Sequence, residues 1–118
     1  MKLSLTQADG DLSRLALNGN VTTRELSPVS DPLGELLGPS GYGRQVLLDM
    51  SGAAYLDSSG VGWLLACHKR FRQAGGKLVI HSLTPTVSNV MKVLKLERVL
   101  EIATTATSGE VAVRGGAV

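Results

Sequence analysis

The sequence predicts a single α/β domain. Its 118 residues are enough to bury one core, and 43% of them are hydrophobic while only 3% are aromatic, so the core must be aliphatic. Two patterns indicate the class: an apolar-polar alternation near the N-terminus, typical of a β-hairpin, and a strand, helix, strand order over residues 44–81. We expect one domain over residues 1–118, with its core over about 2–102 and a short helix or tail over 103–118.

The N-terminal segment predicts the hairpin. Leucines alternate with polar residues from Leu3 onward and again up to Leu17, on either side of the turn Ala8-Asp9-Gly10-Asp11. Asp-Gly favours a type I′ turn because both residue types tolerate a positive φ angle. We place the two strands near residues 2–8 and 11–18.

Prolines and glycines interrupt residues 19–43, and no long helix fits there. A short helix is expected over Asp31–Leu37, because an Asp cap followed by proline is a typical helix start. Residues 38–43 are expected to form a loop.

Two short apolar runs, Arg44 to Met50 and Lys77 to His81, predict central strands that are covered on both faces. The segment between them predicts a helix that ends at Gly75-Gly76, since its apolar residues follow helical spacing. The residues of this stripe are Val61, Leu64, Leu65, His68 and Phe71. A connection of this kind between parallel neighbours is right-handed, which places the helix on one face of the sheet.

The C-terminal part predicts one more helix and one more strand. The helix is expected to open at Thr84-Pro85, and a last short strand is expected over Val99–Ile102. The apolar stripe of this helix would consist of Val87, Val90, Met91 and Leu94.

Composition argues against several classes of function. A net charge of +2 is too small to neutralise the phosphates of a nucleic acid, and four aromatic side chains are too few to stack on its bases. No stretch approaches the 18 apolar residues of a membrane span, and the chain starts without the pattern of a signal peptide, so we expect no direct membrane insertion. The single Cys67 cannot form an internal disulfide and is expected to be a small buried residue. These features predict a cytoplasmic protein.

The sequence also argues against an enzyme, a cofactor or a metal site. Leu56 stands where a nucleophile elbow around Ser58 would need glycine, and no phosphate-loop motif occurs. His68 lies on the apolar stripe, so it is interpreted as a core or boundary residue rather than a metal ligand. We expect a binding module without catalysis.

The most informative motif is Asp57-Ser58-Ser59-Gly60-Val61-Gly62, placed where the loop after a central strand is expected to become a helix. Ser58 is predicted to be the N-cap, with its hydroxyl accepting from the Val61 amide. A hydroxyl at a helix start is exposed, and a phosphate there would be tolerated because the helix end is positive. A plain serine cap followed by two glycines that allow close helix packing would give the same pattern, so both interpretations stay open.

The string Tyr55-Leu56-Asp57-Ser58-Ser59-Gly60-Val61-Gly62, together with Ala74-Gly75-Gly76-Lys77-Leu78-Val79 and Thr84-Pro85-Thr86-Val87, resembles the STAS family of bacterial anti-sigma factor antagonists. The resemblance implies a STAS-like mixed β-sheet of four to five strands with helices packed mainly on one face. It also implies that Ser58, with Ser59 as second choice, is phosphorylated by a partner anti-sigma factor that is a GHKL-type serine protein kinase. A PP2C-type phosphatase would reverse the modification. Unmodified, the protein would bind the kinase and free a sigma factor for transcription.

The resemblance places a partner surface on the motif and its surroundings. Asp57 would either contact the partner or act as a second cap, and Trp63 is a candidate surface anchor. Thr22 stands where the family commonly carries an acidic residue, in Gly19-Asn20-Val21-Thr22. The predicted partner-binding residues are Thr22, Asp57, Ser58, Ser59, Gly60, Val61, Gly62 and Trp63.

Two further departures from the family concern helices: Pro28 and Pro32 interrupt its first long helix, and the last helix looks shortened. An alternative is a STAS module of a transporter, lipid-transport or stress-signalling complex, which binds a protein without sigma-factor control. Either protein would be a monomer or a weak homodimer.

Overall fold

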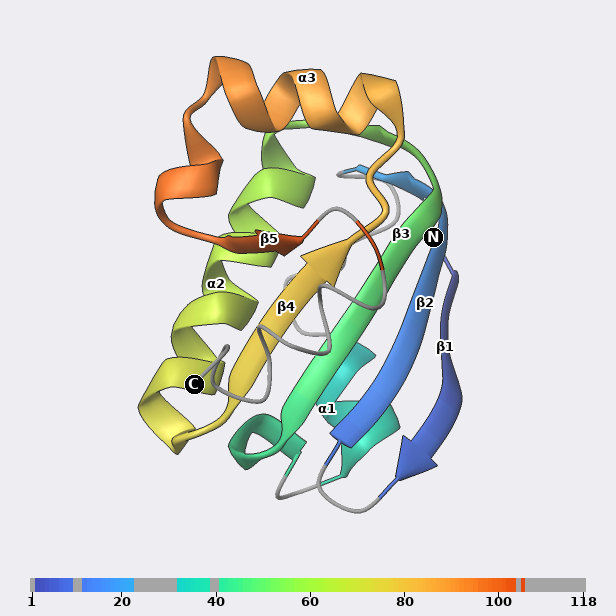
Figure 1. Ribbon diagram of the computed structural model, residues 1–118, viewed down its shortest axis with the longest axis vertical. Helices are drawn as coiled ribbons and strands as arrows, with labels where there is room; N and C mark the ends of the chain where they lie inside the picture. The colour runs from blue at the N-terminus through green and yellow to red at the C-terminus, as the bar shows by residue number, and fades with distance from the viewer. Residues whose placement is uncertain (1, 10–11, 23–31, 39–40, 104, 106–118) are drawn as a thin grey trace.

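A five-stranded mixed sheet forms the centre of the molecule. The computed structural model describes residues 2–9, 12–22, 32–38, 41–103 and 105. The strands lie in sequence order across the sheet; β1 and β2 are antiparallel, and each later pair is parallel (Figure 1). Their bounds are β1 Lys2–Asp9, β2 Leu12–Val21, β3 Gln45–Leu56, β4 Lys77–His81 and β5 Glu101–Ala103. The α/β class and the mixed five-stranded sheet that the resemblance implied are thus confirmed.

The predicted hairpin is confirmed, but its register differs from the expected one. Asp9 pairs with Leu12, so Asp9 belongs to β1 and not to the turn. Gly10 and Asp11 lie outside the described residues, and with them the predicted type I′ turn. The second strand also runs to Val21, three residues beyond its predicted end at Asn18.

The central strand β3 is much longer than predicted. It continues six residues past Met50 to Leu56 and pairs with β2 up to the partners Val21 and Leu56. Residues 51–55 are small or polar apart from one tyrosine, so their sequence carries no strand pattern of its own. The neighbouring β2 supplies the pairing, and Ala53 and Leu56 still point into the core. The extra length places the motif directly at the end of a strand.

Three helices cover one face of the sheet. They are α1 Pro32–Leu37, α2 Ser58–Ala74 and α3 Pro85–Val93, with short 3₁₀ helices η1 Gly41–Gly43 and η2 Leu96–Arg98. α1 lies where the short helix was expected, although its proposed Asp31 cap is outside the described residues. Gly41–Gly43 was expected to be loop and forms the η1 turn instead.

The predicted helix ends are confirmed for α2 and α3. Gly75 follows α2 in the left-handed conformation with φ 84°, and the Gly76 amide donates to the Phe71 carbonyl at 2.8 Å. Thr84 caps α3: its hydroxyl accepts from the Val87 amide at 3.4 Å and donates to the Ala53 carbonyl of β3 at 3.0 Å. The start of α3 is therefore fixed to the central strand.

Two details near the C-terminus were predicted wrongly. Leu94 was placed on the buried stripe of α3, but it lies just past the helix end and is 53% exposed. The last strand was placed at Val99–Ile102, whereas β5 begins at Glu101, because the amides of Val99 and Leu100 both donate to the Leu96 carbonyl of η2. Ala103 ends β5, and residues 106–118, expected to be a short helix or tail, lie outside the described residues.

The core follows the alternation of the strands. Inward residues of β2, β3 and β4 pack with α1, α2 and α3 in one large cluster, in which Cys67 is buried as predicted. The alternate residues Leu12, Leu47 and Val79 form a small cluster on the opposite face. In Figure 1, α1 and α2 lie behind the sheet. The one-sided helix packing that the resemblance implied is confirmed.

Candidate functional site

The motif lies at one edge of the sheet, where two parallel strands end together. Val21 of β2 pairs with Leu56 of β3, and the next residue on each strand is Thr22 and Asp57. The Asp57 amide donates to the Val21 carbonyl at 3.2 Å, which ties the two strand ends together. The structure therefore brings Thr22 beside the motif, 35 positions away in sequence, as the resemblance implied.

Asp57, and not Ser58, is the N-cap of α2. Its backbone is extended, with φ −96° and ψ −175°, and its carboxylate Oδ1 accepts from the Gly60 amide at 3.0 Å. Its carbonyl accepts from the Val61 amide at 2.9 Å. The prediction that the Ser58 hydroxyl accepts from Val61 was wrong. A carboxylate one residue earlier is the stronger acceptor at the positive end of a helix, and the strand end already holds Asp57 in the extended conformation.

Ser58 is consequently the first residue of α2, and its side chain is exposed. No hydrogen bond joins its hydroxyl to any residue within the described parts of the chain. Ser59, the second candidate for modification, is only partly exposed. Of the two serines, Ser58 therefore presents its hydroxyl more openly to solvent.

The two glycines of the motif have different structural roles. Gly60 is buried, and a Cβ atom there would overlap the Val21 carbonyl oxygen and the Leu56 side chain. Gly62 is exposed, and a Cβ atom there would meet nothing within 4 Å. The interpretation that both glycines allow close helix packing therefore holds for Gly60 alone.

The remaining predicted residues lie further from the exposed edge. Val61 is 8% exposed and belongs to the core, so its side chain faces away from any partner. Trp63 is half-buried and packs against the core. It stands five residues after Ser58, about 140° around the helix axis, so the two side chains face different directions.

One residue near the motif was missed as a site candidate. Tyr55, two residues before Asp57, is 49% exposed and is a large aromatic side chain next to the strand end. Strand alternation alone would not have identified it, because the pairing with β2 shifts register here and both Ala53 and Leu56, three positions apart, are buried. The strand was predicted to end at Met50, so Tyr55 lay outside it and was not considered as a residue near the end of a strand.

Nowhere in the described part of the chain do three or more His, Cys, Asp or Glu side chains gather closely enough to hold a metal ion. None of the helices within it is both long and apolar enough to cross a membrane.

Comparison with known proteins gives the same family as the motif. Residues 4–102 match the family model described as "Mlab, STAS domain". A candidate anti-sigma factor antagonist from Thermotoga maritima superposes with a TM-score of 0.79 at 20% identity, over 92% of each chain. An anti-sigma factor antagonist from Mycobacterium paratuberculosis gives 0.77 at 15% identity, over 96% of this chain and 95% of that one.

A third similar structure is the anti-sigma factor antagonist SpoIIAA in its unphosphorylated form. It superposes with a TM-score of 0.68 at 17% identity, over 99% of this chain and all of the other (100%). At such identities the structures establish a common fold, whereas the family model spans most of the sequence. The chain belongs to the STAS domain family.

Proposed function

We propose that this protein is an anti-sigma factor antagonist whose binding is controlled by phosphorylation of Ser58. The observation that carries the proposal is the exposed Ser58 hydroxyl at the first position of α2, beside a cap that Asp57 supplies. The STAS family and the likeness to structures of anti-sigma factor antagonists support it. The unmodified protein would bind an anti-sigma factor that is also a GHKL-type serine kinase, and a sigma factor would be released.

The switch would act through charge. A phosphate on Ser58 adds about −1.5 to −2 charges at a solvent-exposed point, where the positive end of α2 offsets part of the charge within the domain. Asp57 is already negative there, so the combined charge would face outward into any interface. Moving a binding equilibrium from 1:99 to 99:1 needs roughly 5.5 kcal/mol, and a dianion against a desolvated or acidic surface can supply a large part of that. The chain itself performs no chemistry in this mechanism. A PP2C-type phosphatase would remove the phosphate from Ser58 and so restore the binding form of the protein.

Phosphotransfer tests the proposal. The purified protein, ATP and a GHKL-type kinase encoded near its gene should give a singly phosphorylated product, with the phosphate on Ser58 by mass spectrometry. Ser58→Ala should abolish the transfer, and Ser59→Ala, the matched control one residue away, should retain it. If phosphate transfer persists in Ser58→Ala and is lost in Ser59→Ala, then Ser59 is the modified residue and the proposal is refuted.

A second function is favoured by a different observation. The matching family model is described as Mlab rather than as an anti-sigma factor antagonist, and Thr22 replaces the acidic residue expected beside the motif. These points support a STAS module that binds a protein of a transporter, lipid-transport or stress-signalling complex. Affinity capture from detergent-solubilised cells discriminates between the two: membrane components would indicate this function, and a GHKL-type kinase would indicate the first.

A further inference from the structure

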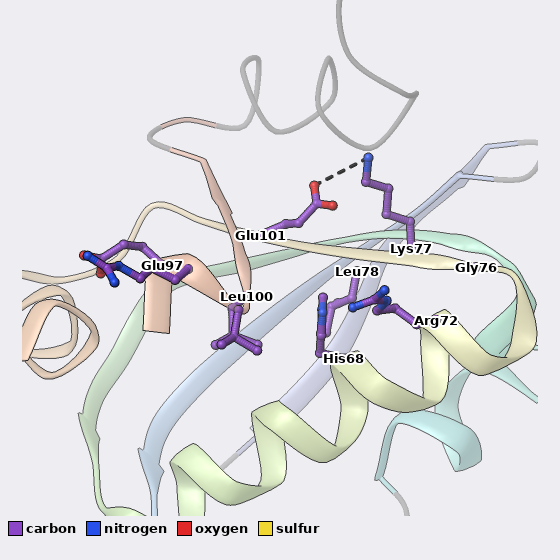
Figure 2. Close-up of a pocket in the computed structure, with 10 residues that line it drawn as sticks. His68, Arg72, Gly76, Lys77, Leu78, Glu97, Leu100 and Glu101 are labelled. Atoms are coloured by element: carbon purple, nitrogen blue, oxygen red, sulfur yellow. Dashed lines mark ion pairs between the residues drawn. The ribbon is translucent and has the colours of Figure 1, made fainter. Parts of the chain in front are cut away.

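A pocket lies at the opposite end of α2 from Ser58. It has a volume of about 460 Å³ and is formed between the last turns of α2, the start of β4, and the segment from η2 to β5 (Figure 2). Arg72, on its α2 wall, stands fourteen residues after Ser58, which is about 21 Å along the helix. This pocket is therefore separate from the phosphorylation site.

The lining of the pocket is more polar than apolar. Its apolar part comes from Val99, which is 53% exposed, and to a small extent from Leu78 and Leu100, which are only 3% and 5% exposed. His68 and Arg72 are four residues apart on α2, so their side chains are neighbours on one face of the helix, as Figure 2 shows. Such a lining can hold the body of a small molecule and orient its polar end.

The charges that line the pocket leave an excess of positive charge. Lys77 and Glu101 form an ion pair at 3.4 Å and largely offset each other. Arg72, on α2, and Arg98, on η2, make no ion pair with any residue in the described part of the chain, and Glu97 is the one remaining acidic group in the lining. Guanidinium groups bind carboxylate and phosphate through two parallel hydrogen bonds. An oxyanion is thus the polar group that this lining favours.

The size of the pocket indicates more than a simple ion. Small-molecule sites span roughly 300–1,000 Å³, whereas a water-sized group occupies about 30 Å³. We propose that this pocket binds a small organic anion: its phosphate or carboxylate group would lie against the Arg72 guanidinium, and its apolar body would lie on Leu100 and Val99. Because the pocket and the motif lie at opposite ends of α2, a ligand in the pocket would leave Ser58 accessible.

Titration of the isotope-labelled protein with four probes, followed by NMR, tests the proposal. Phenyl phosphate and benzoate each carry an oxyanion and a ring, while phenol lacks the anion and inorganic phosphate lacks the body. At least one of the first two should shift the amide signals of Leu78 and Leu100 saturably, with affinity about tenfold or more above both half-probes. Which of the two binds more tightly identifies the head group as phosphate or carboxylate. Absence of a saturable shift with either, or equal binding of inorganic phosphate, would overturn the proposal.

Charge-removing variants locate the site. Arg72→Gln should lower the affinity by about tenfold or more, since it removes the charged hydrogen-bond donor to the anion, whereas Arg98→Gln, on the η2 wall, should lower it less. Lys69→Gln is the matched control, because Lys69 is an exposed cation on α2 that does not line the pocket. Both arginines are exposed, so the variants should keep a folded spectrum. An equal loss of affinity in Lys69→Gln would show that any nearby positive charge has this effect, and it would refute specific binding of the anion in the pocket.

Discussion

At the residue scale, the two glycines of the motif are the sharpest contrast in the molecule. Gly60→Ala should lower the free energy of unfolding by about 1–3 kcal/mol, because its Cβ atom meets the Val21 backbone and the Leu56 side chain. Gly62→Ala should be neutral or stabilise by up to about 1 kcal/mol, because its Cβ atom meets open space and alanine favours helix. Urea denaturation of both variants measures the difference. Equal effects would mean that α2 does not approach β2 as described.

The capping assignment gives a second contrast between neighbours. Asp57→Ala should destabilise the protein by about 0.5–2 kcal/mol, since the Gly60 amide loses its acceptor. Ser58→Ala should change stability by less than about 0.5 kcal/mol, because the exposed hydroxyl is not part of the cap. Asp57→Asn is the control, because it keeps an acceptor oxygen. Thermal denaturation measures the stability of the three variants. A larger loss of stability in Ser58→Ala than in Asp57→Ala would show that Ser58 is the cap.

These two residues also show what sequence reasoning could and could not reach. Both Asp57 and Ser58 are good N-cap residue types, and spacing along the sequence does not distinguish them. The end of β3 decides: it extends to Leu56, which leaves Asp57 extended and Ser58 already helical. The position of the motif at a helix start was predictable, whereas the role of each residue depended on strand pairing with β2.

At the element scale, the sequence predicted the parts whose pattern is local. α2 and β4 were found because helical spacing and a short apolar run identify them, and the caps at Gly75 and Thr84 follow from residue type. The second half of β3 was missed because its strand character comes from pairing, which no local pattern records. Leu94 was misplaced for a related reason: α3 ends one residue earlier, so helical spacing no longer applies to it.

The sheet face opposite the helices carries a buried histidine, and this predicts a pH dependence. Burial lowers the pKa of His81 below its ordinary value of 6.5; Asp49 opposes this shift and Arg14 adds to it. The ring Nδ1 lies 2.8 Å from the Ser82 hydroxyl oxygen. As the pH falls below 6.5, the unfolded chain takes up a proton at this position that the folded chain resists, so stability should decline until the pH passes the folded pKa.

Denaturation midpoints between pH 7.5 and pH 5 measure this contribution. The wild-type protein should lose stability across this range more steeply than His81→Gln, which has no proton to accept at this position. A slope that is identical in both proteins would show that His81 contributes nothing to the pH dependence.

At the scale of the whole molecule, α2 connects two separate surfaces. Its first residue lies at the edge where β2 and β3 end, and its last turns line the pocket against η2 and β5. In Figure 1, α1 and α2 lie behind the sheet and α3 crosses the molecule at the ends of the strands; side chains of all three pack into the main core. The net charge of the chain is +2, so the single phosphate proposed on Ser58 would bring it to about zero.

The proposed switch requires that phosphate on Ser58 weakens partner binding. Its most direct test is calorimetric titration of the partner kinase with the protein carrying phosphoserine at position 58, and with the unmodified protein. Phosphoserine at position 51, an exposed serine of β3 outside the motif, provides the control. We predict that phosphate on Ser58 weakens binding by about a hundredfold or more, equivalent to about 2.7 kcal/mol, while phosphate on Ser51 leaves it nearly unchanged. Equal affinity of the unmodified and Ser58-phosphorylated proteins would contradict the account.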